Sequence, residues 1–194
     1  MSQVSGFSIT RSSEVGGAAG SSAAKIVSSG GNSGCSCPRM KFEDGFRYTE
    51  GRELWMRGAW YFENPAALSW SRMMNLISYT GGGNDFYTGL VIEGSSGQML
   101  VRSRLYHSTS GQKQILPARP IPVGRWFTVV LHMKLSPVDG RALTEMYLDG
   151  NKVASSTVAN MHNSQTINAF QAGMPYFLSG VNTTVFFDNP ALKD

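Results

Sequence analysis

One ten-residue stretch limits the folds open to this chain more than any other. In residues 126–135, WFTVVLHMKL, the odd positions from 127 onward are all apolar, whereas the even positions include Thr128, His132 and Lys134. Side chains of a β-strand alternate between its two faces, so a pattern of period two predicts a strand with one buried face. The residues that we expect in the core are Phe127, Val129, Leu131, Met133 and Leu135.

Turn signals separate this stretch from other strand-like segments. FYTGLVIEG and QMLVRSRLYHS are joined through Gly-Ser-Ser-Gly, and Asp149-Gly150 stands between ALTEMYL and VASSTV. Asp-Gly tolerates positive φ angles and favours a tight hairpin, so we interpret it as a structural turn and not as a ligand contact. The best short helical candidate is NPAALSW, residues 64–70. Many strands at hairpin spacing predict an all-β fold with two antiparallel sheets in a sandwich.

The beginning of the chain differs in composition from the rest. Residues 1–22 are rich in Ser and Gly, and we expect them to form an arm that joins copies of this chain or different chains into an oligomer. Residues 23–194 form the predicted sandwich domain. The N-terminus has no basic segment followed by an apolar one, so no secretory signal is predicted. No apolar run approaches ~18 residues, which argues against a membrane span. We expect synthesis in the cytoplasm, with a virion or other particle surface as one destination.

Positive charge is concentrated in one part of the sequence. The net charge is +4, and no acidic residue lies between Glu93 and Asp139. That interval carries Arg102, Arg104, Lys113, Arg119, Arg125 and Lys134. Such an excess favours an anionic partner, either an acidic glycan or the acidic face of an assembly partner. A nucleic acid is disfavoured, because the chain has no dense basic cluster and no binding motif.

Alternation also selects candidate ligand-binding residues on three strands. Arg102, Arg104 and Tyr106 share one parity, opposite to apolar neighbours, and we expect no acidic partner nearby in the chain. Two further strands place Arg57 with Tyr61, and His132 with Lys134, on their polar faces. If the three faces belong to one concave sheet, these seven residues form one binding site.

Two long segments carry a resemblance to a known superfamily. GRWFTVVLHMKLSPVDGRALTEMYLDGNKV and AFQAGMPYFLSGVNTTVFFDNPAL are similar to strands of the concanavalin A-like jelly-roll superfamily, including laminin-G-like lectin modules and jelly-roll polysaccharide lyases. The resemblance covers roughly residues 42–194 and implies the sandwich fold. Its lectins, glycosidases, lyases and virion proteins share that fold, so function stays open. The glycine before Trp126, at the start of a strand, indicates a core anchor at this tryptophan.

The resemblance also raises the question of a metal. Similar sandwiches carry a structural calcium near a C-terminal aspartate, which here is Asp188, and Glu43 and Asp44 could supply further oxygens. Calcium needs six or more oxygen ligands, so the alternative is that Asp188 caps the end of its strand. Cys35 and Cys37 are interpreted as free thiols or a local bridge, since no further ligands lie at metal spacing.

Two functions follow from these observations. The paired carboxylates of a glycosidase motif are missing. Elimination by a lyase needs a carboxylate neutraliser, a base and an acid, for which Arg102, His132 and Tyr106 are the candidates, with His107 as an alternative base. Only partial echoes of the alginate-type lyase motifs occur, in GRELWMRG and AFQAGMPYF. We therefore predict a non-catalytic lectin-like sandwich that binds carbohydrate or serves as a structural particle subunit, with a uronate-cleaving polysaccharide lyase as the alternative.

Overall fold

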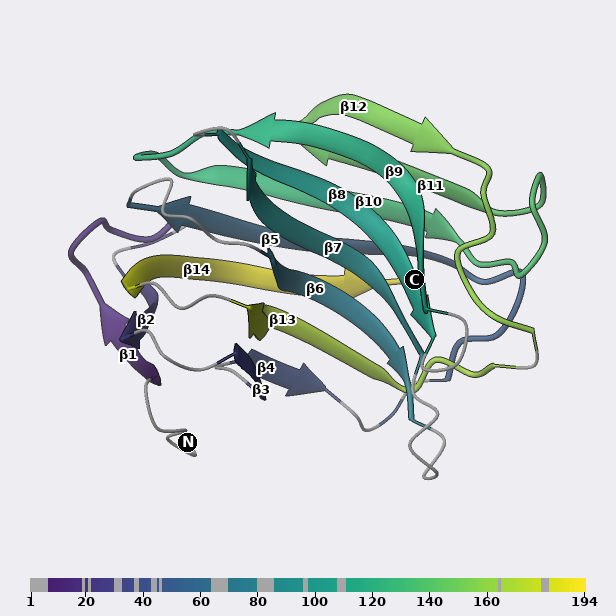
Figure 1. Ribbon diagram of the computed structural model, residues 1–194, viewed down its shortest axis with the longest axis horizontal. Helices are drawn as coiled ribbons and strands as arrows, with labels where there is room; N and C mark the ends of the chain where they lie inside the picture. The colour runs from purple at the N-terminus through teal and green to yellow at the C-terminus, as the bar shows by residue number, and fades with distance from the viewer. Residues whose placement is uncertain are drawn as a thin grey trace.

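A computed structural model shows two antiparallel β-sheets packed face to face (Figure 1). It describes residues 7–18, 20, 22–29, 33–36, 39–42, 45, 47–63, 70–79, 86–95, 98–107, 111–163, 165–178 and 182–194. These residues contain strands and turns and no helix, which confirms the predicted all-β jelly-roll sandwich. Within them there is accordingly no apolar helix of a length that could cross a bilayer. The predicted helical candidate at residues 64–70 falls almost wholly outside the described residues.

Each sheet contains seven strands among these residues. The first sheet has the order β1 (Phe7–Ser12), β2 (Ala23–Ser29), β14 (Asn182–Lys193), β5 (Glu53–Phe62), β10 (Phe127–Lys134), β11 (Leu143–Leu148) and β12 (Asn151–Ser156). The second has the order β3 (Ser33–Ser36), β13 (Ala169–Leu178), β6 (Trp70–Ser78), β7 (Phe86–Ser95), β8 (Gln98–His107) and β9 (Gly111–Ile121), with β4 (Arg39–Phe42) also paired to β13.

The core lies between the two sheets and follows the predicted alternation. The odd residues of β10 and the adjoining Leu135 are at most 2% exposed, as the sequence predicts. They pack against large side chains from both sheets, including Trp60, Phe62, Phe86 and Phe170. Because inward residues alternate with outward ones along a strand, the charged side chains of β5, β8 and β10 point to the outer faces of the two sheets.

The Asp149-Gly150 pair forms the predicted hairpin turn between β11 and β12. Both residues have positive φ angles, 48° and 82°. The Oδ1 atom of Asp149 accepts a hydrogen bond from the backbone nitrogen of Thr128 at 2.8 Å, and its other oxygen binds Arg125. The aspartate therefore ties the turn to the start of β10, which is a structural role.

The N-terminal segment adds a hairpin to the edge of the first sheet. β1 pairs with β2, and β2 pairs with β14. Trp126 is only partly buried and its Nε1 donates to the carbonyl of Val15 at 3.2 Å. The prediction that Trp126 anchors the core is therefore wrong: its indole lies under the turn of this hairpin. The boundary at residue 22 and contacts of the arm with other chains stay predictions.

Candidate functional site

The seven predicted ligand-binding residues do not converge. Arg102, Arg104 and Tyr106 lie on β8 in the second sheet. Arg57 and Tyr61 on β5, and His132 and Lys134 on β10, belong to the first sheet. Both sets have the parity that points away from the shared core, so they lie on opposite sides of the sandwich. The condition that would have united them, a single concave sheet, is not met.

His132 is enclosed by residues of its own sheet. Its Nε2 atom lies 2.6 Å from Glu53 Oε1, and its Nδ1 atom lies 3.0 Å from Glu145 Oε2. Trp55 stacks on its ring at 3.9 Å with an angle of 9° between the planes. The side chains of His132, Lys152 and Tyr147 donate hydrogen bonds that hold the pKa of Glu145 at about 2. Both ring nitrogens of His132 are occupied, so this cluster is a closed network.

A different set of side chains gathers on the outer face of the second sheet. Gln171, Asn75, Gly89 and Arg104 are direct neighbours across β13, β6, β7 and β8. A Cβ on Gly89 would lie 2.0 Å from the carbonyl oxygen of Met74 and 2.9 Å from Asn75 Oδ1. Only glycine leaves room for β6 at this point. Asn75 is fully buried, and among the described residues neither its Oδ1 nor its Nδ2 has a hydrogen-bond partner.

Two tyrosines and an arginine stack beside this row. The guanidinium of Arg72 lies 3.4 Å from the ring centroid of Tyr87, and the rings of Tyr87 and Tyr106 are 4.7 Å apart at 16°. Burial raises the pKa of Tyr87 even though Arg72 and Arg104 act in the opposite direction. Its phenol therefore stays protonated, while the partly exposed Tyr106 stacks beside it on the neighbouring strand.

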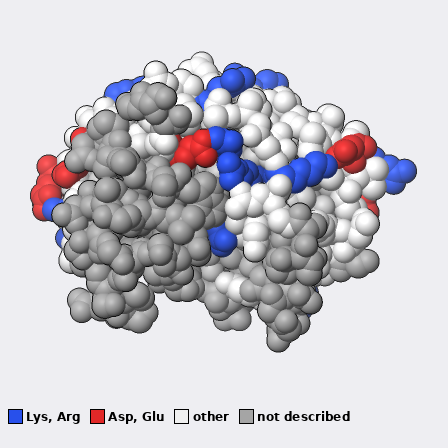
Figure 2. Space-filling model, in the orientation of Figure 1, with Lys and Arg blue, Asp and Glu red and all other residues white. Residues whose placement is uncertain are grey.

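The arginines of β8 have an acidic partner that we did not expect. Glu93 on β7 contacts Nη2 of Arg102 and lies 3.5 Å from Nη2 of Arg104. The hairpin register brings the last acidic residue before the basic interval beside both arginines, so the expectation of no local partner is wrong. Figure 2 shows the result as a band of basic side chains across this face with acidic ones beside it. Two arginines share one carboxylate, so a positive charge remains.

Five residues of this face were missed in the sequence: Arg72, Asn75, Tyr87, Gly89 and Gln171. One signal could have found them. Gly89 interrupts the largely apolar and aromatic run FYTGLVI, and a glycine inside a strand often marks a close approach of backbone or ligand. The side chain of the alternative base, His107, is outside the described part of the chain.

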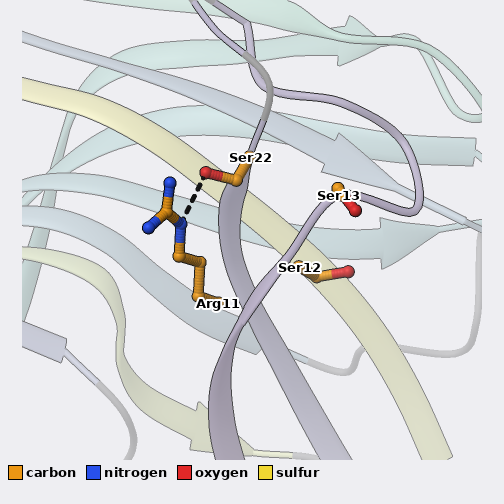
Figure 3. Close-up of a pocket in the computed structure, with 4 residues that line it drawn as sticks. All are labelled: Arg11, Ser12, Ser13 and Ser22. Atoms are coloured by element: carbon orange, nitrogen blue, oxygen red, sulfur yellow. Dashed lines mark hydrogen bonds between the residues drawn. The ribbon is translucent and has the colours of Figure 1, made fainter.

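A separate pocket lies at the hairpin of β1 and β2. Arg11, Ser12, Ser13 and Ser22 line it, and Arg11 Nε donates to Ser22 Oγ at 2.8 Å (Figure 3). It belongs to the edge of the first sheet, so it is distinct from the face built by Asn75 and Arg104.

Few oxygen atoms surround Asp188, the residue predicted to bind calcium, among the described residues. Asp188 lies inside β14 at a β-bulge, so the alternative of a strand-end cap is wrong, and its Oδ1 accepts a hydrogen bond from the backbone of Asn189 at 2.8 Å. Its Oδ2 and the carbonyl of Gly20 lie 3.0 and 3.1 Å from the position of a Cβ on Gly17. No metal-binding group of three or more acidic, His or Cys side chains occurs among the described residues. Glu43, Asp44, Cys37 and the side chain of Cys35 lie outside them, so the site stays a prediction.

Comparisons with known proteins identify solved structures that share this fold. Solved structures with the same fold include an endo-β-1,4-glucuronan lyase from the fungus Trichoderma reesei, with a TM-score of 0.70, 19% identity and coverage of 96% of this chain and 86% of that one. A cellulose-induced protein has a TM-score of 0.63 and 16% identity, with coverage of 97% of this chain and 86% of that one. An alginate lyase from Aplysia kurodai has a TM-score of 0.56 and 12% identity, with coverage of 96% of this chain and 87% of that one. A search of curated sequences found no match.

The family assignment comes from a family model. The model of polysaccharide lyases matches residues 8–191, nearly the whole chain. This match overturns the prediction of a non-catalytic lectin-like sandwich or virion subunit and favours the alternative that we named. The chain belongs to the polysaccharide lyase family.

Proposed function

We propose that this protein is a polysaccharide lyase that cleaves a uronate-containing glycan by β-elimination on the outer face of the second sheet. The observation that supports this most is the row of Gln171, Asn75, Gly89 and Arg104 beside the Arg72–Tyr87–Tyr106 stack. Arginine, amide and phenol groups meet there in a chain of the polysaccharide lyase family. The named activities of the similar structures, on glucuronan and alginate, also point to a glycan that contains uronates.

The reaction makes two demands on these groups. A base removes the proton at C5 of the uronate, the electron pair forms a C4–C5 double bond, and the C4–O4 bond breaks as O4 takes up a proton. Negative charge builds up on the uronate carboxylate before the bond breaks. We assign the stabilisation of this charge to Arg104 and the amide of Asn75, because hydrogen-bond donors fixed before the reaction need little reorganisation.

Tyr106 is our candidate for proton transfer. It is partly exposed, whereas Tyr87 beside it is buried and stays protonated. In this proposal the phenolate form of Tyr106 accepts the C5 proton, and the phenol so formed returns that proton to O4 on the same side of the sugar. His132 takes no part in this proposal, since it lies on the other sheet between Glu53 and Glu145.

The test compares single hydroxyl deletions on the two sheets. The wild type, Tyr106→Phe and Tyr61→Phe are incubated with glucuronan, alginate and neutral cellulose, and the unsaturated product is followed by its ultraviolet absorbance. We expect cleavage of a uronate polymer only, a loss of about 100-fold or more in kcat for Tyr106→Phe, and little change for Tyr61→Phe.

Two results would contradict the proposal in different ways. Absence of unsaturated product from every uronate polymer would refute lyase activity on polyuronates. Full activity of Tyr106→Phe together with loss of activity in His132→Gln would return the catalytic role to the first sheet.

A further inference from the structure

The carboxylate of Glu93 lies beside both arginines on the outer face of the second sheet, but it is closer to Arg102 than to Arg104. Glu93 shares the outward parity of Tyr87 and Gly89 on β7. Its side chain is only 15% exposed, and the side chains of Arg102 and Arg104 are 18% and 20% exposed. An acidic group held this closely against the arginines is part of the face that a substrate would meet.

The two arginines are not equally compensated. Arg102 uses Nη2 for Glu93 and donates from Nη1 to Gln114 Oε1 at 3.1 Å. Arg104 donates from Nη1 to Gln112, but its Nη2 reaches Glu93 only at 3.5 Å. One carboxylate therefore neutralises Arg102 and leaves most of the positive charge at Arg104.

That remaining charge lies next to the proposed reaction centre. Arg104 is the direct neighbour of Gly89, which is the direct neighbour of Asn75. Arg102 is one step further along β8, opposite Val91. A substrate carboxylate at Arg104 gains a charge-assisted contact, whereas a second carboxylate above Arg102 meets a neutral pair and loses its hydration without compensation.

Building on the proposed lyase function, we propose that Glu93 is a specificity-determining residue. It suppresses recognition of a second uronate carboxylate at Arg102, so that the face takes one uronate at Arg104 beside an uncharged sugar unit. The substrate class is then a glycan in which uronates are interspersed with neutral or esterified units.

The experiment measures preference between two forms of one polymer. Glucuronan and a partially methyl-esterified glucuronan are titrated against the wild type, Glu93→Gln, Arg102→Gln and the double variant, and the two dissociation constants give a ratio for each protein. Cleavage rates on both polymers are recorded in parallel. The control is Glu63→Gln, which removes the same charge from an exposed position directly after β5.

We expect Glu93→Gln to shift the ratio about fivefold towards the fully charged polymer and to steepen its dependence on salt. The double variant restores the charge balance and should return to the wild-type ratio. Arg102→Gln leaves Glu93 without its main partner and should shift the ratio the other way. If Glu93→Gln does not fold, the ratio measured for Arg102→Gln still tests the role of Glu93. Glu63→Gln should match the wild type.

An unchanged ratio in both Glu93→Gln and Arg102→Gln would overturn the role of Glu93, as would a double variant that behaves like Glu93→Gln alone. The proposed function fails separately, if the wild type binds the polymers but releases no unsaturated product. In that case the dissociation constants still decide the role of Glu93. Lack of binding to both polymers would overturn the role of Glu93, and if alginate were not cleaved either, it would overturn the proposed function as well.

Discussion

Two fully buried asparagines differ in whether their side-chain amides are hydrogen-bonded, and this difference can be tested by mutation. Asn160 has its amide satisfied: Nδ2 donates to the carbonyls of Lys134 and Leu143 at 3.0 and 2.9 Å, and Oδ1 accepts from the backbone of Ser136 at 3.0 Å. Asn75 has the same burial and, within the described residues, no partner for either amide atom. Replacing Asn160 by leucine removes a hydrogen-bonded amide, whereas replacing Asn75 by leucine removes an amide without a partner among the described residues.

The structure predicts opposite effects on the free energy of unfolding. In Asn160→Leu, two carbonyls, the hydroxyl of Thr144 and one backbone N–H lose a partner. Each such group costs about 1–3 kcal/mol, so we expect a loss of about 4 kcal/mol or more. In Asn75→Leu, the same principle returns about 1–3 kcal/mol, because an amide buried without a partner is removed. The extra bulk beside Gly89 offsets about 1 kcal/mol of that gain.

The assay pairs urea unfolding with cleavage of glucuronan. We expect Asn75→Leu to be as stable as the wild type or up to about 2 kcal/mol more stable, and to lose most of its activity, since the carboxylate loses an amide donor. A loss of stability in Asn75→Leu as large as that in Asn160→Leu would refute the reasoning, because it would mean that Asn75 is bonded in the free protein. Full activity of Asn75→Leu would remove it from the site.

Two further predictions concern other parts of the sandwich. The pKa of Glu145, about 2 against an ordinary 4.5, means that its stabilising effect is complete above about pH 4.5 and is lost as the pH falls towards 2. Glu145→Gln should therefore flatten the fall in melting temperature over that range, and a parallel fall in both proteins would contradict the assigned hydrogen bonds. Gly89→Ala should separate β6 from β7 and reduce both stability and activity, because its Cβ would overlap Met74, whereas Gly20→Ala, with nothing within 4 Å, should match the wild type in thermal unfolding.

The fold could be predicted from the sequence because alternation is a local property. In β10 each odd residue is apolar, and the pleat alone assigns these side chains to one face. The Asp149-Gly150 turn is equally local, since two residues with positive φ determine the hairpin. No distant part of the chain is needed for either inference.

The site could not be predicted in the same way, because parity does not say which sheet a strand joins. Arg102 and His132 both have an outward parity, yet β8 and β10 belong to different sheets and their outer faces point in opposite directions. The pairing of Glu93 with Arg102 and Arg104 also depends on strand register. In the sequence, Glu93 only marks the start of the interval without acidic residues, and its position beside the two arginines becomes visible only when the strands are paired.

The two polar clusters differ in a property that residue types alone do not reveal. On the first sheet, His132 has a carboxylate at each ring nitrogen, and Glu145 accepts from Tyr147 and Lys152 as well. On the second sheet, the amide of Asn75 and the Nε atom of Arg102 are buried without partners among the described residues. Burying such groups costs free energy, and selection for stability alone would remove them. A cluster that keeps this cost is the better candidate for ligand binding, which is why the proposed chemistry is assigned to the second sheet and not to the more complete histidine network.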